Sequence, residues 1–266
     1  MSESERSSCK PIEVWGLPLM PYTIGDALDH VARIVASGKP GYIITANLHY
    51  AMLCDTDPRL GAVNERAAFI VADGMPLVWA SKLMGTPLPE RVAGSDLIWK
   101  VCERAARDKQ RIFILGGAPG VAEAAGQKLV QLYPGLLLAG SYSPPYRPLT
   151  DAEEADLIER LNASSAHILI LAFGQPNGEL WIARNCERIK IPACIQLGAS
   201  IDFVVGKVKR APRWMQRMGL EWFFRLIQEP RRLIRRYARN IRFLIRMIFS
   251  RTRRRTVRRD ATVGDR

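Results

Sequence analysis

An aspartate stands directly behind a short apolar run, where a carboxylate could do acid–base chemistry. Residues 68–72 predict a buried strand, and Asp73 follows it, just ahead of Gly74 and Pro76. A carboxylate held there, partly buried in a cleft, could take a proton as a general base. The same loop would also suit an aspartate that caps the next helix. The local sequence leaves both interpretations open.

Two adjacent glycines, Gly116 and Gly117, end another predicted strand and precede a predicted helix over 121–132. Backbone N–H groups at such a helix start can bind a phosphate. The spacing is not GxGxxG, and no acidic residue follows at the distance that a dinucleotide site requires. A tight turn and a diphosphate cradle are therefore equally indicated.

Metal chemistry has one candidate motif, Asp55-Thr56-Asp57, which has the DxD form found in nucleotide-sugar enzymes. Such carboxylates should follow a strand, but residues 49–54 predict a helix. The five cysteines contain no CxxC pair, and the three histidines do not cluster. We therefore predict no metal site and no cofactor.

Short apolar runs alternate with helical patterns through the first 206 residues. The runs that predict strands begin near residues 42, 68, 111, 167 and 193. Continuous apolar strands separated by helices predict an α/β fold, a Rossmann-like and largely parallel sheet with helices on both faces. Ligands of such sheets bind outside the carboxyl ends of the strands, which is where Thr45, Asn47 and Asp73 lie.

The charge of the chain is concentrated near its C-terminus. The 266 residues carry a net charge of +13, and residues 207–259 hold 19 Lys or Arg against two acids. Basic and apolar residues alternate there at helical spacing, basic at Arg232, Arg235, Arg239, Arg242 and Arg246, apolar at Leu233, Tyr237, Ile241, Leu244 and Ile248. This pattern predicts a basic helical C-terminal appendage.

We divide the chain into an α/β domain (1–206), a basic amphipathic appendage (207–250) and a disordered basic tail (251–266). A merely solvated face is the ordinary explanation of a charge run, but the excess is larger than solubility requires. An anionic membrane surface fits better than nucleic acid, because aromatic residues suited to stacking on bases are sparse. The first ten residues are polar, and no apolar run reaches the ~18–20 residues of a membrane span. We expect a cytoplasmic chain, peripheral on the inner face of the cell membrane.

Short motifs follow one another in order over roughly residues 12–237. They are TAN (45–47), VADGMP (71–76), RVAGSD (91–96), the glycine pair, GASIDF (198–203), RAPRWM (210–215), GLEW (219–222) and the segment 225–237. Each motif is weak alone. Taken in order, they resemble the WecG/TagA/CpsF glycosyltransferase family.

The resemblance implies inverting transfer of a sugar from a UDP-sugar donor to a polyprenyl-diphosphate-linked sugar acceptor, in bacterial cell-surface polysaccharide synthesis. It implies that residues 1–206 form a nucleotide-sugar-binding catalytic domain and residues 207–250 a membrane- or acceptor-binding appendage. It also implies that Asp73, as general base, and Thr45 are catalytic. It implies that substrate is bound by Asn47, Arg91, Gly116, Gly117, Gln175, Asp202, Arg225, Arg232 and Arg235. Among these, Arg91 and the arginines at 225, 232 and 235 are the candidates to neutralise the diphosphates. The sequence is compatible with a homo-oligomer but does not name the oligomeric state.

The chain departs from the family at one place. The family usually has a glutamine where this chain has Gly178, and that glutamine is associated with the donor sugar. The identity of the sugar is therefore not carried over, and Gln175 or Asn177 are the candidates to supply the lost hydrogen bonds. The alternative function is a non-enzymatic nucleotide-binding module whose basic tail holds nucleic acid.

Overall fold

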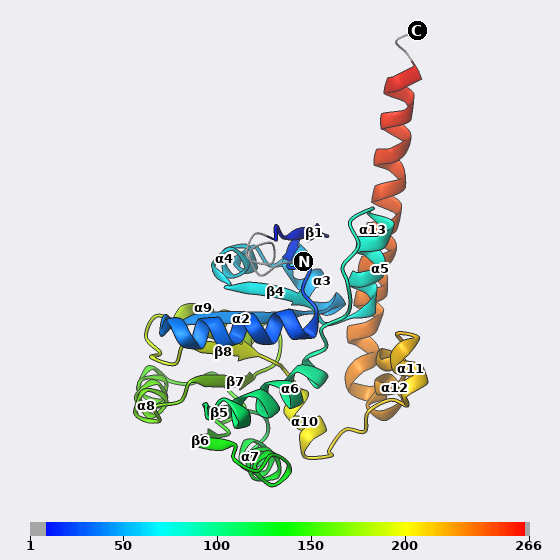
Figure 1. Cartoon of the computed structure of the whole chain (residues 1–266). Helices are drawn as coiled ribbons and strands as arrows, with labels where there is room; N and C mark the ends of the chain where they lie inside the picture. The colour runs from blue at the N-terminus through cyan, green and yellow to red at the C-terminus, as the bar shows by residue number, and fades with distance from the viewer. Residues whose placement is uncertain (1–8, 264–266) are drawn as a thin grey trace.

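The computed structural model describes residues 9–263, without the side chains of Arg217, Arg232 and residues 250–263. Its centre is a six-stranded sheet in the order β4-β3-β8-β7-β5-β6, and every neighbouring pair is parallel (Figure 1). The strands are β3 (Gly41–Ala46), β4 (Phe69–Ala72), β5 (Arg111–Gly116), β6 (Leu137–Tyr142), β7 (Ile168–Ala172) and β8 (Ala193–Gln196). A small antiparallel hairpin, β1 (Ile12–Val14) and β2 (Leu17–Leu19), precedes them. The predicted fold class is confirmed.

Helices cover both faces of the sheet and bury one apolar core on each. One core contains residues of α3 (Leu48–Thr56), α4 (Arg59–Arg66), α5 (Met75–Leu83), α8 (Asp151–Ala163) and α9 (Asn177–Asn185). The other contains residues of α2 (Ile24–Ser37), α6 (Gly94–Arg107), α7 (Val121–Leu132) and α10 (Ser200–Val204). The strands therefore form from almost continuous apolar residues, because both of their faces are buried.

Strand alternation decides which face each residue of β3 meets. Tyr42 and Ile44 belong to the first core and Ile43 to the second. By the same alternation, Thr45 lies on the side of α6 and α10. Local sequence sets the start of two helices, because Thr23 and Thr150 are the N-cap residues of α2 and α8 and each forms a capping box.

The basic C-terminal segment is helical and comprises α11 (Arg213–Arg217), α12 (Glu221–Gln228) and α13 (Pro230–Val263). The helix α13 packs against α3, and its C-terminal part projects beyond the globule (Figure 1). The segment 251–266, for which composition predicts disorder, coincides up to Val263 with the end of this helix. The side chains of residues 250–263 lie outside the described residues. The proposed division of the chain into domains stays a prediction. Within residues 9–263, we find no helix with enough apolar length to cross a bilayer.

Candidate active site

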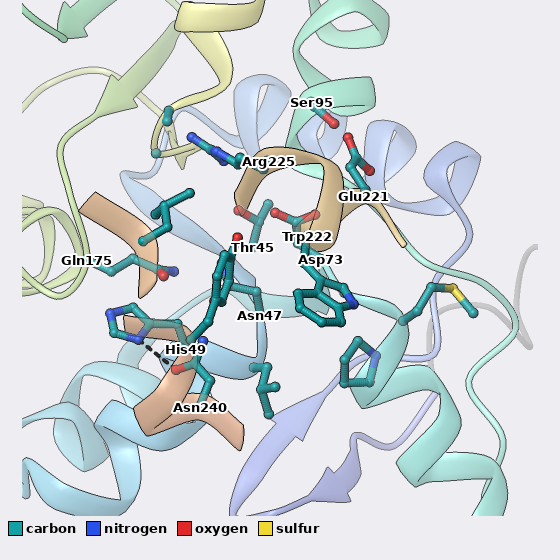
Figure 2. A pocket seen from close by; sticks show the side chains of 18 of the residues that line it. Thr45, Asn47, His49, Asp73, Ser95, Gln175, Glu221, Trp222, Arg225 and Asn240 are labelled. Atoms are coloured by element: carbon teal, nitrogen blue, oxygen red, sulfur yellow. Dashed lines mark hydrogen bonds between the residues drawn. The ribbon is translucent and has the colours of Figure 1, made fainter. Parts of the chain in front are cut away.

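A cavity of about 360 Å³ lies at the carboxyl ends of four neighbouring strands, β4, β3, β8 and β7, and is covered by α12 and α13. Figure 2 shows the side chains of 18 of the residues that line it. Six of the predicted site residues line this cavity together, namely Thr45, Asn47, Asp73, Arg91, Gln175 and Arg225. The parallel sheet brings them together, because these positions follow or end its strands or belong to the segments that cover them.

Asp73 is half-buried and does not cap the helix that follows it. The N-cap of α5 is Gly74, and no side chain caps this helix, whereas the Gly94 N–H at the start of α6 is close enough to Asp73 to favour its ionised form. Burial raises the pKa of Asp73 to about 7, against the opposing effect of Arg91 and reinforced by the charge of Glu221. A carboxylate with this pKa is suited to accept a proton near neutral pH.

Thr45 on the neighbouring strand β3, and Asn47 just after that strand, line the cavity with Asp73. A Cβ placed on Gly94 would lie 3.4 Å from Thr45 Oγ1 and 3.5 Å from Asp73 Oδ2, so these two groups converge on one point. The Thr45 hydroxyl donates to the carbonyl of Gln196 at 3.0 Å, which leaves its oxygen able to accept a hydrogen bond from a substrate. The side-chain oxygen of Asn47 caps α3 by accepting from the Tyr50 N–H at 3.1 Å.

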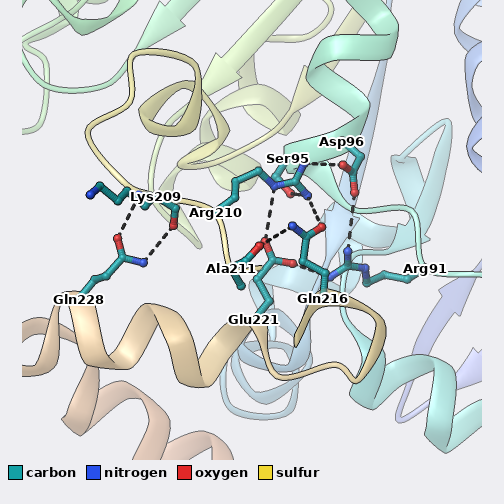
Figure 3. Close-up of polar contacts among 9 residues, drawn as sticks. All are labelled: Arg91, Ser95, Asp96, Lys209, Arg210, Ala211, Gln216, Glu221 and Gln228. Carbon is teal, nitrogen blue, oxygen red and sulfur yellow. Dashed lines mark hydrogen bonds and ion pairs between the residues drawn. The ribbon is translucent and has the colours of Figure 1, made fainter. Parts of the chain in front are cut away.

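An ionic network joins the α/β domain to the appendage (Figure 3). Arg91 pairs with Glu221 at 2.7 Å and with Asp96 at 3.6 Å, while Arg210 pairs with Asp96 at 2.6 Å. The side chains of Arg91 and Glu221 are only 16% and 18% exposed, so solvent screens this pair weakly. Arg91 is thus already paired with two carboxylates. For Arg91 to contact a diphosphate, as predicted, its ion pair with Glu221 would have to break.

The cavity wall is cationic. Its described residues include four cations, Arg91, Lys209, Arg225 and Arg236, and two carboxylates, Asp73 and Glu221. The guanidinium of Arg225 lies over the ring of Phe203, 5.4 Å from its centre, and is near enough to Asp73 to lower its pKa. A wall with this balance favours a phosphate-bearing ligand.

Four predicted substrate-binding residues are placed elsewhere. Gly116 and Gly117 form a tight turn outside the described cavity wall, with φ of 117° and 79°. The Gly117 N–H already donates to the Ala172 carbonyl, and that of Ala122 to Ser143, so two donors near the start of α7 are taken. This geometry favours the turn over the phosphate cradle. Asp202 and the exposed Arg235 also lie outside the described wall, and their roles stay predictions. The side chain of Arg232 is outside the described residues.

Several cavity residues were not predicted. His49 on α3 hydrogen-bonds Asn240 on α13 at 3.1 Å, and both side chains are buried. Burial lowers the pKa of His49 to about 4, helped by the charges of Arg236 and Arg239. The histidine is therefore neutral at pH 7. Gln196, at the carboxyl end of β8, also lines the cavity, and a polar residue ending an apolar run was a signal that could have found it.

The DxD segment lies where the helical prediction placed it. Asp55 belongs to the last turn of α3, Asp57 is its C-cap residue, and the two pair with Arg246 and Arg59 respectively. Among the residues that the structure describes, no three His, Cys, Asp or Glu side chains form a group that could hold a metal ion.

The fold and the cavity define an α/β protein with a carboxyl of raised pKa in a cationic, ligand-sized cavity. The model of the glycosyl transferase WecG/TagA/CpsF family matches residues 12–257, and the chain belongs to this family of glycosyltransferases. One relative is the N-acetylglucosaminyldiphosphoundecaprenol N-acetyl-beta-D-mannosaminyltransferase of Bacillus spizizenii. It is 34% identical over 194 residues, which cover 73% of this chain and 74% of the relative.

Proposed function

We propose that this chain transfers a sugar from a UDP-sugar to the sugar of a polyprenyl diphosphate, with inversion and with Asp73 as general base. The observation that carries the proposal is the Asp73 carboxyl, which lies in a cationic cavity with a pKa of about 7. The lipid-diphosphate acceptor is inferred from the name of the Bacillus relative.

The reaction needs three events in one place. The acceptor hydroxyl oxygen attacks the anomeric carbon of the donor, Asp73 takes the hydroxyl proton, and the bond to UDP breaks so that UDP leaves with the electron pair. Thr45, whose oxygen can still accept, orients a sugar hydroxyl beside Asp73. The charge that develops on UDP is stabilised by the cationic wall, for which Arg225 and Arg236 are candidates.

The appendage is suited to hold the acceptor at a membrane surface. The apolar residues of α13 divide between two directions. Leu233 and Phe243 are buried against the globule, whereas Ile234, Ile241, Ile245 and Ile248 are 47–59% exposed. Exposed isoleucines among arginines fit insertion into an anionic membrane surface, so we propose peripheral attachment to the inner face of the cell membrane.

The test is a screen of UDP-sugars against a synthetic lipid-diphosphate-linked N-acetylglucosamine, with the linkage of the product read by NMR. Transfer with inversion at the anomeric carbon is expected for one donor. Retention of configuration, or no product with any donor, would refute the proposal. No observation on the described residues favours the alternative of a nucleic-acid-binding module, and membership of a glycosyltransferase family speaks against it.

A further inference from the structure

The side chain of Gln196 occupies the space that a side chain at position 178 would fill. A Cβ placed on Gly178 would lie 1.8 Å from Gln196 Nε2 and 2.6 Å from its Cδ. Gly178 is not among the residues of positive φ, so its backbone would accept other residues. A side chain at position 178, the second residue of α9, would therefore force the amide of Gln196, which comes from the neighbouring strand β8, to move.

The amide of Gln196 is held in one orientation. Its side chain is buried, and Nε2 donates to the carbonyl of Phe173 at 2.9 Å, which turns Oε1 the other way. Among the described residues, this Oε1 finds no hydrogen-bond partner, and neither does the buried Oε1 of Gln175. Both residues line the cavity. Buried carbonyl oxygens are normally satisfied, so this pair points to a ligand that donates hydrogen bonds.

The buried carboxyl of Glu179 lies near the side-chain amides of Gln175 and Gln196. Glu179, the residue after Gly178, is fully buried, and within the described chain its oxygens lack a partner of good geometry. Desolvation raises its pKa to about 7, and the nearby amides of Gln175 and Gln196 oppose part of that rise. This end of the cavity is therefore rich in hydrogen-bond acceptors, and its carboxyl is about half ionised at pH 7.

The position of Gln196 relative to Asp73 identifies the part of the substrate it meets. The strands run in the order β4, β3, β8, so Gln196 is two strands from the one that Asp73 follows, on the order of 10 Å. Thr45, on the strand between them, donates its hydroxyl to the Gln196 carbonyl. A sugar whose anomeric carbon lies near Asp73 can extend its other substituents toward Gln196.

We propose that the Gln196 carboxamide, in the space left by Gly178, binds the transferred sugar by accepting a hydrogen bond from one of its hydroxyl or acetamido groups, and so determines donor selectivity. The inference rests on the proposed function. It makes positions 178 and 196 interdependent, because a side chain at 178 would displace the Gln196 amide from its present position.

The test combines three variants with one control, each assayed for transfer, for UDP affinity by calorimetry and for thermal stability. Gln196→Met keeps the length but removes the amide, and should lower kcat/KM ~10–100-fold with UDP affinity unchanged. Gly178→Gln should destabilise the protein and abolish transfer. The double variant Gly178→Gln with Gln196→Gly should regain stability and part of the transfer, with altered donor preference. The control, Gln131→Met on the exposed side of α7, should match wild type.

The outcomes separate the two proposals. If wild type transfers sugar and Gln196→Met does so at the same kcat/KM, the inference about Gln196 is wrong and the proposed function stands. A fall in UDP affinity that matches the fall in kcat/KM would assign Gln196 to the nucleotide and also overturn it. A double variant that is stable but as inactive as Gly178→Gln would also overturn the inference about Gln196. A wild-type protein that transfers no sugar from any UDP-sugar would refute the proposed function, and this inference with it.

Discussion

The replacement of Asp73 by asparagine should make the protein more stable above neutral pH, although it removes the proposed base. Folding raises the pKa of this carboxyl from 3.8 to about 7, so the folded state holds a proton that the unfolded state has already released. Stability therefore falls as pH rises from about 4 to 7 and stays reduced above it. At about 1.4 kcal/mol per pKa unit, the ionised Asp73 costs about 4 kcal/mol at pH 8.

Denaturant unfolding of wild type and Asp73→Asn at pH 5 and pH 8 measures this cost. The buried Glu179 has a similarly raised pKa, but it is present in both proteins and cancels in their difference. We expect Asp73→Asn to gain stability relative to wild type, by a few kcal/mol more at pH 8 than at pH 5. Equal differences at the two pH values would refute the desolvated state of Asp73 on which the acid–base argument depends.

Three further predictions concern the rest of the site. Transfer should persist in EDTA, because Asp55 and Asp57 are paired with arginines; complete loss that Mg²⁺ or Mn²⁺ restores would reinstate them as ligands. Ile245→Ser combined with Ile248→Ser should weaken co-sedimentation with anionic liposomes, because both side chains are about half exposed, and unchanged binding would contradict the membrane role of α13. As pH falls from 6.5 to 4, wild type should lose up to about 3 kcal/mol of stability because His49 resists protonation in the folded state. His49→Gln should not show this loss, which urea unfolding at a series of pH values will measure.

The elements with continuous apolar runs could be predicted from sequence, whereas the edge strand β6 and the N-terminal hairpin could not. The helix predicted over 121–132 is α7 with the same bounds, and the five predicted strands are β3, β4, β5, β7 and β8. The edge strand β6 was missed because Gly140 and Ser141 interrupt its apolar residues, most of which are only half-buried. The hairpin of β1 and β2 was missed because its strands are three residues long and Pro18 lies in one of them.

The candidate site divides in the same way. Asp73, Thr45 and Asn47 could be predicted because each stands at the carboxyl end of a strand, where parallel sheets bind ligands. Glu221 and Asn240 could not be assigned a place, because they reach the cavity only when α12 and α13 dock on it. Their partners Arg91 and His49 are 130 and 191 residues away in the sequence. No local pattern encodes such a contact.

The role of Asp73 as general base is tested most directly by the pH dependence of transfer in wild type and Asp73→Asn. The measurement is kcat/KM between pH 5.5 and 9, with the best UDP-sugar and a lipid-diphosphate-linked acceptor. For wild type, the rate should rise with pH and reach half its plateau near pH 7, because only the ionised carboxyl accepts the proton. In Asp73→Asn the rate should be ~10²–10⁴-fold lower and this rise should be absent. Near-wild-type transfer by Asp73→Asn, with the same pH profile, would contradict the assignment.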